Sequence, residues 1–184
     1  LQGGGTNSTT WHLSFTVYSA SGSLLADEYR TGKSNYNNVA QFAIETLGAN
    51  IINDISAGHL DDKMIPIISS LKVPYIAMHT RGTPSTMSNL TNYNNITADV
   101  ILELSQQINR LTLAGVNDII IDPGFGFAKT LEQNFELLQN LESLHELGYP
   151  LLVGISRKSM IYKTLKTTPK DALNGTTVLN TVAL

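Results

Sequence analysis

The sequence has 184 residues, of which 42% are hydrophobic and 15% are charged, and its formal net charge is −3. This is the composition of a globular chain long enough for one domain with its own core, and the weak negative charge gives no electrostatic case for nucleic acid or an anionic membrane as partner. The lack of cysteine excludes disulfides, thiolate metal sites and a cysteine nucleophile. No apolar run approaches the ~20 residues of a membrane span and no secretory signal is visible, so we expect a cytoplasmic protein.

The first part of the chain, residues 1–35, is rich in Gly, Ser and Thr and contains no Pro. Residues 11–18 alternate loosely between apolar and polar side chains, which predicts a half-exposed strand. A turn at residues 19–22 and a second strand at residues 24–29 complete a predicted hairpin. We interpret residues 1–35 as an atypical N-terminal segment, separate from residues 36–184.

From residue 36 onward, helical patterns alternate with short apolar runs. The predicted helices span residues 39–47, 61–72, 96–114, 130–147 and most of 157–184. The predicted strands span residues 51–55, 74–79, 118–122 and 150–155. Pro66 predicts a kink or a delayed start in the second helix. Thr130 and Gln133 have capping-box spacing, and glycines are placed to end three of the helices.

Apolar strands without alternation are covered on both faces, as parallel strands are. Four such strands joined by helices fit either a doubly wound sheet or part of a (β/α)8 barrel. No GxGxxG pattern follows the first strand, which counts against a dinucleotide-binding fold. We therefore predict an α/β fold of the TIM-barrel type, with about four parallel β/α units.

Polar residues follow each predicted strand at its carboxyl end, where ligands bind in both architectures. They are Asn53-Asp54, Met78-His79, Asp122 and Ser156-Arg157-Lys158. Asn53 or Asp54 alone could cap the next segment, but four such ends in succession favour one shared polar site.

The segment Asp122-Pro-Gly-Phe-Gly-Phe127 places a carboxylate, two glycines and two aromatic rings together. This pattern suits a flat heteroaromatic ligand whose amidine-like edge donates to Asp122. The alternative is a tight turn whose phenylalanines fill the core, and for Phe125 both interpretations are equally supported. Phe127 remains a candidate ligand contact.

Two further loops carry candidate ligand groups. Ser156 to Ser159 combine hydroxyls, two cations and free helix-start amides, as in an anion site, although a solvated basic turn is the alternative. Arg81 lies in a loop that could act as a lid or contact phosphate. His79 could contact a ligand or be a buried histidine bonded to backbone.

Four motifs resemble the dihydropteroate synthase family, and they match it in order and spacing. They are Gly48-Ala-Asn-Ile-Ile-Asn-Asp-Ile-Ser56, Met78-His-Thr-Arg-Gly-Thr-Pro84, Asp122-Pro-Gly-Phe-Gly-Phe-Ala-Lys129 and Gly154-Ile-Ser-Arg-Lys-Ser159. The resemblance implies a pterin-binding TIM barrel and a transferase of folate biosynthesis. Such an enzyme joins p-aminobenzoate to 6-hydroxymethyl-7,8-dihydropterin diphosphate, with pyrophosphate loss helped by Mg²⁺.

The resemblance also assigns residues. Those matching Asn53 and Asp122 hold the pyrimidine edge of the pterin, and the one matching Lys158 hydrogen-bonds the pterin. We take Lys158 and Asp122 as catalytic. Ser156 lies near the p-aminobenzoate carboxylate, Phe127 and Gly154 line the pocket, and Asp27 aligns with a pterin-binding aspartate of the family.

The family's opening strand, with its metal ligand, and its final strand are not seen in this sequence, so we expect a barrel incomplete at both ends. We assign no metal ligand here, although the family implies Mg²⁺. An open half-barrel exposes apolar surface, which predicts poor solubility or a homodimer unless residues 1–35 cover it. The alternative function is a non-catalytic pterin-binding half-barrel.

Overall fold

The computed structural model describes residues 12–18, 24–31 and 36–184 of the chain. In the first two of these ranges, β1 (His12–Tyr18) and β2 (Leu24–Thr31) pair as an antiparallel two-stranded sheet. The two strands predicted for the N-terminal hairpin therefore pair with each other. The predicted turn at residues 19–22 lies outside the described residues.

The main sheet is parallel and follows chain order: β3 (Ile52–Asp54), β4 (Tyr75–Met78) and β5 (Ile119–Asp122). The fourth predicted strand is reduced to one bridge between Ile121 and Leu151. Its two hydrogen bonds are 2.9 Å and 2.8 Å long, from Ile121 N to Pro150 O and from Leu152 N to Ile121 O. Each connection between neighbouring strands contains a helix, as parallel pairing requires.

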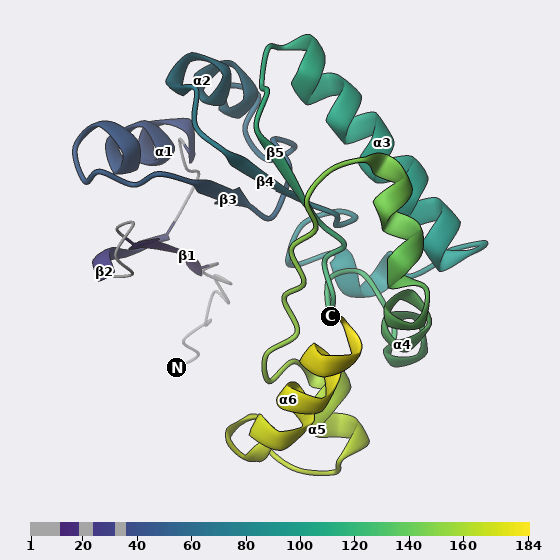
Figure 1. Cartoon of the computed structure of the whole chain (residues 1–184). Helices are drawn as coiled ribbons and strands as arrows, with labels where there is room; N and C mark the ends of the chain where they lie inside the picture. The colour runs from purple at the N-terminus through teal and green to yellow at the C-terminus, as the bar shows by residue number, and fades with distance from the viewer. Residues whose placement is uncertain (1–11, 19–23, 32–35) are drawn as a thin grey trace, which may run out of the picture.

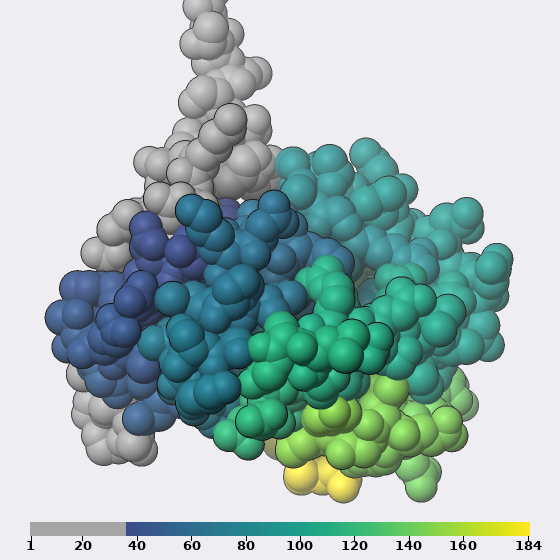
Figure 2. All heavy atoms as spheres, turned by 90° about the horizontal axis from the view of Figure 1, so that it is seen from above, coloured from purple at the N-terminus to yellow at the C-terminus, as the bar shows by residue number. Residues whose placement is uncertain are grey.

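The helices follow the same order around the sheet. They are α1 (Tyr36–Glu45), α2 (Met64–Leu71), α3 (Ile96–Leu113), α4 (Leu131–Gln139), α5 (Ser159–Thr164) and α6 (Leu173–Val182). Short 3₁₀ helices occupy Met87–Asn89, Leu141–Leu147 and Pro169–Asp171. Helix α1 packs beside α2, and α3 packs beside α4 (Figure 1). In Figure 2 the blue part of the chain and its yellow-green C-terminal part lie on different sides of the molecule. This arrangement is a stretch of barrel wall, as the sequence predicted.

The observed helix boundaries agree with most of the predicted start and stop residues. α2 starts at Met64, so Pro66 falls in its first turn, where its missing N–H has no helical partner to lose. The capping box of Thr130 and Gln133 forms as predicted. The predicted helix over 130–147 is wrong in one respect, because α4 ends at Gln139. There the Asn140 side chain donates to Glu136 O at 2.8 Å and competes with the backbone for that carbonyl.

The sheet has two chemically different faces. Ile52, Tyr75 and Ile119 are register partners on one face, and all three are buried. Apolar residues of α3 cover the core at helical spacing: Val100, Leu104, Ile108 and Leu111. The opposite face starts with the partners Asn53, Ile76 and Ile120. It continues with Met78 and Asp122, two residues further along. In a barrel this second face is the interior, and its carboxyl end is the mouth.

Among the described residues, no helix combines the length and the hydropathy needed to cross a membrane.

Candidate functional site

The adjacent residues Asn53 and Asp54 point to opposite faces of the sheet and have different roles. Asp54 is buried and accepts four hydrogen bonds. They come from Ser56 N and Oγ at 2.8 and 2.7 Å, from Gly58 N at 2.9 Å and from Tyr75 Oη at 2.6 Å. The predicted capping role therefore belongs to Asp54. Asn53 is exposed on the interior face, with no side-chain hydrogen bond to any described residue.

Asp122 ends β5 on the same interior face as Asn53. Strands lie about 4.8 Å apart, so these two residues are separated by ~10 Å across β4 and by two positions along the strands. The Asp122 side chain is buried, and its Oδ1 accepts from Gly124 N at 2.7 Å. Burial raises the pKa of this carboxyl. The Gly124 N–H bond and the charges of Lys158 and Lys129 oppose that rise.

Gly154 lies close to both the carboxylate of Asp122 and the ammonium of Lys158. A Cβ atom on Gly154 would lie 3.8 Å from Asp122 Oδ2 and 3.9 Å from Lys158 Nζ. Lys158 occupies the N-cap position of α5 without a side-chain capping bond, and its ammonium instead donates to Phe125 O. Burial lowers the pKa of Lys158, and the Asp122 charge opposes this effect. Two opposite charges thus border a space that any larger side chain at residue 154 would fill.

The turn after β5 is tightly constrained. Gly124 has φ +69°, and a Cβ there would stand 2.0 Å from His79 O, so any other residue at this position would force the turn to move. Gly126 has φ +81°, and its N–H donates to Asn134 Oδ1 at 2.6 Å. Phe125 is fully buried in the core, which decides between the two interpretations for this ring. Phe127 is half-buried, and its ring centroid lies 5.0 Å from Lys158 Nζ.

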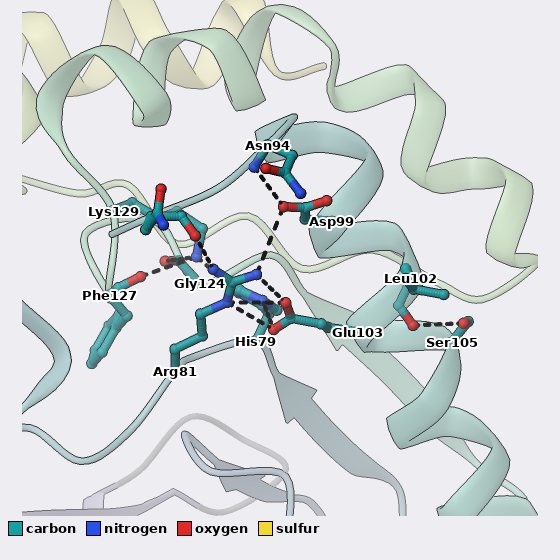
Figure 3. Close-up of polar contacts among 11 residues, drawn as sticks. His79, Arg81, Asn94, Asp99, Leu102, Glu103, Ser105, Gly124, Phe127 and Lys129 are labelled. Carbon is teal, nitrogen blue, oxygen red and sulfur yellow. Dashed lines mark hydrogen bonds and ion pairs between the residues drawn. The ribbon is translucent and has the colours of Figure 1, made fainter. Parts of the chain in front are cut away.

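A network of buried and partly buried polar side chains supports this turn (Figure 3). Lys129 Nζ donates to His79 Nδ1, and His79 Nε2 contacts Glu103 Oε2, both at 3.0 Å. Glu103 also accepts from Arg81, whose guanidinium stacks on the Tyr93 ring at 3.7 Å.

This network settles the roles of two predicted candidates. His79 is fully buried and bonded to side chains rather than to backbone. Arg81 ties its loop to α3 through Glu103, and it also donates to Asn92 O at 2.6 Å. Sequence reasoning missed the partners Lys129 and Glu103. Lys129 is the last residue of the motif that begins at Asp122, whereas Glu103 lies in α3, where no sequence motif indicates a role for it.

The residues around the start of α5 are more open. Ser156 is exposed, and its hydroxyl makes no hydrogen bond to any described residue. Arg157 instead binds the C-terminal segment: its N–H donates to Thr176 Oγ1 at 2.9 Å and its guanidinium to Lys170 O at 3.0 Å. Of the two cations predicted for an anion site, only Lys158 therefore borders Asp122.

Two further predictions concern Asp27 and Mg²⁺. Asp27 lies in β2 opposite Thr16, in the two-stranded sheet rather than beside β3, and its side chain lies outside the described residues. Across the described part of the chain, no three His, Asp or Glu side chains cluster in a way that could hold a metal ion.

Comparison with known proteins agrees with this geometry. The family model described as "Pterin binding enzyme" matches residues 34–184. Dihydropteroate synthase from Synechocystis is 44% identical over 141 residues, covering 75% of this chain and 48% of that protein. The Clostridium beijerinckii enzyme of the same name is 42% identical over 148 residues, covering 79% and 52%. The chain thus spans about half the length of these relatives.

Solved structures give the same picture. Dihydropteroate synthase from Thermus thermophilus in complex with 4-aminobenzoate superposes with a TM-score of 0.76 at 34% identity, covering 82% of this chain and 61% of that one. The Yersinia pestis enzyme in complex with a sulfonamide drug gives a TM-score of 0.77 at 32% identity, covering 82% and 55%. The fold is therefore that of a partial dihydropteroate synthase barrel, and the chain belongs to the pterin-binding enzyme family.

Proposed function

We propose that this chain carries the pterin-binding part of a dihydropteroate synthase. The full reaction condenses p-aminobenzoate with 6-hydroxymethyl-7,8-dihydropterin diphosphate. The observation that carries the proposal is the placement of the Asp122 carboxylate and the Lys158 ammonium beside Gly154, with Asp122 on the sheet face that also presents Asn53. The Thermus thermophilus relative is solved in complex with 6HMPPP and with 4-aminobenzoate, which supports the same substrate classes here.

The chemistry of a pterin suits these groups. Its pyrimidine edge carries hydrogen-bond donors, an amino group and a ring N–H. An ionised Asp122 can accept hydrogen bonds from both. One Asp122 oxygen is already held by Gly124 N, so the carboxylate is oriented before the ligand arrives. The Asn53 amide offers both a donor and an acceptor at the far side of the ring. Lys158 supplies a charged donor, and the Phe127 ring beside it gives an apolar surface for stacking.

In the proposed reaction, the arylamine nitrogen of p-aminobenzoate attacks the exocyclic methylene carbon of the pterin. A C–N bond forms, the C–O bond to pyrophosphate breaks, and the amine nitrogen loses a proton. The site lowers the barrier mainly by orientation and fixed dipoles, since both reactants must be held in line. The exposed Ser156 hydroxyl lies two residues before Lys158 in the chain and is proposed to contact the p-aminobenzoate carboxylate.

Isothermal titration with a pterin, with pyrophosphate present, tests the binding part of this proposal. We expect Asp122→Asn to abolish measurable pterin affinity. The amide is uncharged, and it has only one acceptor oxygen where the carboxylate has two, so it cannot accept two hydrogen bonds from the pterin edge. Asp118→Asn is the matched control, since Asp118 is exposed at the other end of the same strand and should leave affinity unchanged. Equal affinities for wild type and Asp122→Asn would discard the site assignment.

Turnover needs a separate measurement. A coupled pyrophosphate-release assay with p-aminobenzoate distinguishes a transferase from a chain that binds pterin without chemistry. Release that depends on p-aminobenzoate and disappears in Asp122→Asn would establish the enzyme. Pterin binding without release would favour the non-catalytic half-barrel.

Three broader expectations also remain proposals. Mg²⁺ in proteins is commonly bound by one or two carboxylates together with substrate phosphates. We propose a Mg²⁺ requirement from family membership, and no step above depends on the ion. A cytoplasmic location is likewise proposed.

A homodimer is the third proposal, but the apolar surface that supports it is not the expected one. The interior residues Ile76 and Met78 are buried, whereas Leu173, Val178 and Val182 of α6 are more than half exposed. Apolar surface of this kind on one helix favours association. A compact monomer in size-exclusion chromatography would contradict it.

A further inference from the structure

The turn after β5 contains a buried lysine that the proposed chemistry does not use. Lys129 is 9% exposed, and its ammonium has three acceptors, each at 3.0 Å: His79 Nδ1, Gly124 O and Phe127 O. An ammonium carries three donors, so none is left for a ligand. Lys129 therefore acts on its own loop and not on a substrate.

The acceptors show what this lysine fixes. In a planar trans peptide the C=O and the following N–H point in opposite directions. Holding the carbonyls of Gly124 and Phe127 therefore also fixes the N–H groups of Phe125 and Ala128, which point away from the ammonium. Gly124 O additionally accepts from Phe127 N at 3.1 Å, so the turn closes around Lys129.

The support behind Lys129 is itself rigid. Because Lys129 donates to Nδ1 of His79, the ring proton stands on Nε2 and is donated to Glu103. Figure 3 shows the sequence of contacts from Lys129 through His79 to Glu103 and Arg81, with the Phe127 ring projecting away from this cluster. β4, α3 and the turn after β5 are thereby joined through hydrogen-bonded polar side chains.

We propose that Lys129 is a positioning residue of the pterin site, which sets the backbone of residues 122–127 and so the orientation of Phe127 and Asp122. Its contact with Asp122 is indirect. Lys129 holds Gly124 O, while Gly124 N donates to Asp122 Oδ1. The inference about ligand affinity rests on the proposed pterin function, whereas the inference about the turn does not.

The first test is Lys129→Met, which keeps a side chain of similar length and removes all three hydrogen-bond donors. We expect the amide protons of Gly124, Gly126 and Phe127 to exchange with solvent at least tenfold faster. Pterin affinity by isothermal titration should fall at least tenfold. The core variant Ile68→Val is the control, because Ile68 is buried in α2 away from the turn. It should lower global stability without changing either readout at the turn.

The outcomes separate cleanly. If the turn amides of Lys129→Met exchange as in Ile68→Val, the positioning role is overturned. If they exchange faster but pterin affinity is unchanged, the turn is positioned by Lys129 but does not control the ligand, and the inference about the site fails. If wild-type protein binds no pterin, the proposed function fails, and the exchange data still decide the role of Lys129.

A second variant covers the case in which Lys129→Met does not fold. Glu103→Gln keeps Lys129 and weakens only the far side of the network, where Glu103 meets His79 and Arg81. We expect about threefold faster exchange at the same turn amides and no change in α2. Unchanged exchange at the turn would show that the network does not support it.

Discussion

Two aspartates end strands of the same sheet, yet they do opposite work. Asp54 at the end of β3 lies on the face that packs against the helices, with Ala77 and Ile121 as register partners. Asp122 at the end of β5 lies on the interior face, with Met78 as partner. Alternate residues of a strand point to opposite faces, so a shift of one position along the strand decides the role of a carboxylate. On one face it bonds to its own turn, and on the other it points toward the mouth of the barrel.

The hydrogen bonds of the two side chains express this difference. Asp54 accepts four, all from its own turn or from Tyr75, and keeps no capacity for a ligand. Asp122 accepts one from Gly124 and faces the ammonium of Lys158 across Gly154. A strand-end carboxylate is thus a ligand candidate only when its own turn leaves part of it unsatisfied.

The strongest way to break this comparison is to remove the charge of each aspartate in turn. Asp54→Asn should cost about 3–5 kcal/mol of unfolding free energy, because an amide group would face donors in a buried site. Asp122→Asn should change stability by about 1 kcal/mol or less, since Gly124 N keeps an oxygen acceptor. Urea denaturation at pH 7 measures both. Equal costs would show that the two carboxylates have the same structural role.

The network behind the β5 turn gives the next largest effect, through pH. Burial lowers the pKa of His79 to about 4, with Lys129 and Arg81 adding to this and Glu103 opposing it. Burial alone would raise the pKa of Glu103, but its bonds with His79 and Arg81 outweigh it and lower the pKa to about 2. The folded state thus resists protonation of both groups more strongly than the unfolded chain does.

The sign of the pH effect follows from the protons bound. Between pH 6.5 and 4 the unfolded chain binds a proton at His79 and the folded protein does not, so stability falls as pH falls through this window. The whole window is worth on the order of 3 kcal/mol, and Glu103 adds a further loss only below pH 4.5. Urea midpoints from pH 7 to pH 5 measure this slope, to which His59 and Lys129 also contribute, because burial lowers their pKa values too, that of Lys129 to about 7. His79→Gln should therefore reduce the slope without removing it, and an unchanged slope would contradict the assignment.

Much of the fold could be predicted from the sequence because its signals are local. The capping box at Thr130 needs only residues three apart, and Gly115 and Gly148 end their helices with positive φ as their positions indicate. The β/α alternation also placed three parallel strands correctly. The split after Gln139 was missed because a helical apolar pattern continues through the 3₁₀ segment.

The site was predictable only in part, since its decisive contacts are not local. The sequence could not choose between Asn53 and Asp54 as capping residue, because the choice depends on which of the two side chains lies on the helix-covered face of the sheet. Lys129 and Glu103 are far apart in the chain, and only the fold brings both to His79. The sequence of a turn motif also does not predict whether its lysine side chain binds a ligand or hydrogen-bonds to backbone carbonyls.

The smallest predicted effect compares two glycines of the β5 turn, and it sharpens the distinction between packing and conformation. Both have positive φ, so alanine at either costs about 1 kcal/mol in backbone strain. At Gly124 the new Cβ would also meet His79 O at 2.0 Å, whereas at Gly126 the nearest atom is Lys158 Cδ at 3.5 Å. We therefore expect Gly124→Ala to cost about 2–3 kcal/mol in total and Gly126→Ala about 1 kcal/mol.

Thermal or urea unfolding of the two variants gives this difference directly, and Gly148→Ala serves as a reference. Gly148 also has positive φ, but no atom lies within 4 Å of its added Cβ, so it reports strain alone. If Gly124→Ala costs no more than Gly148→Ala, the turn can move away from β4. The turn would then not be held against His79 as tightly as the role of Lys129 requires, because that lysine bonds to both His79 and Gly124.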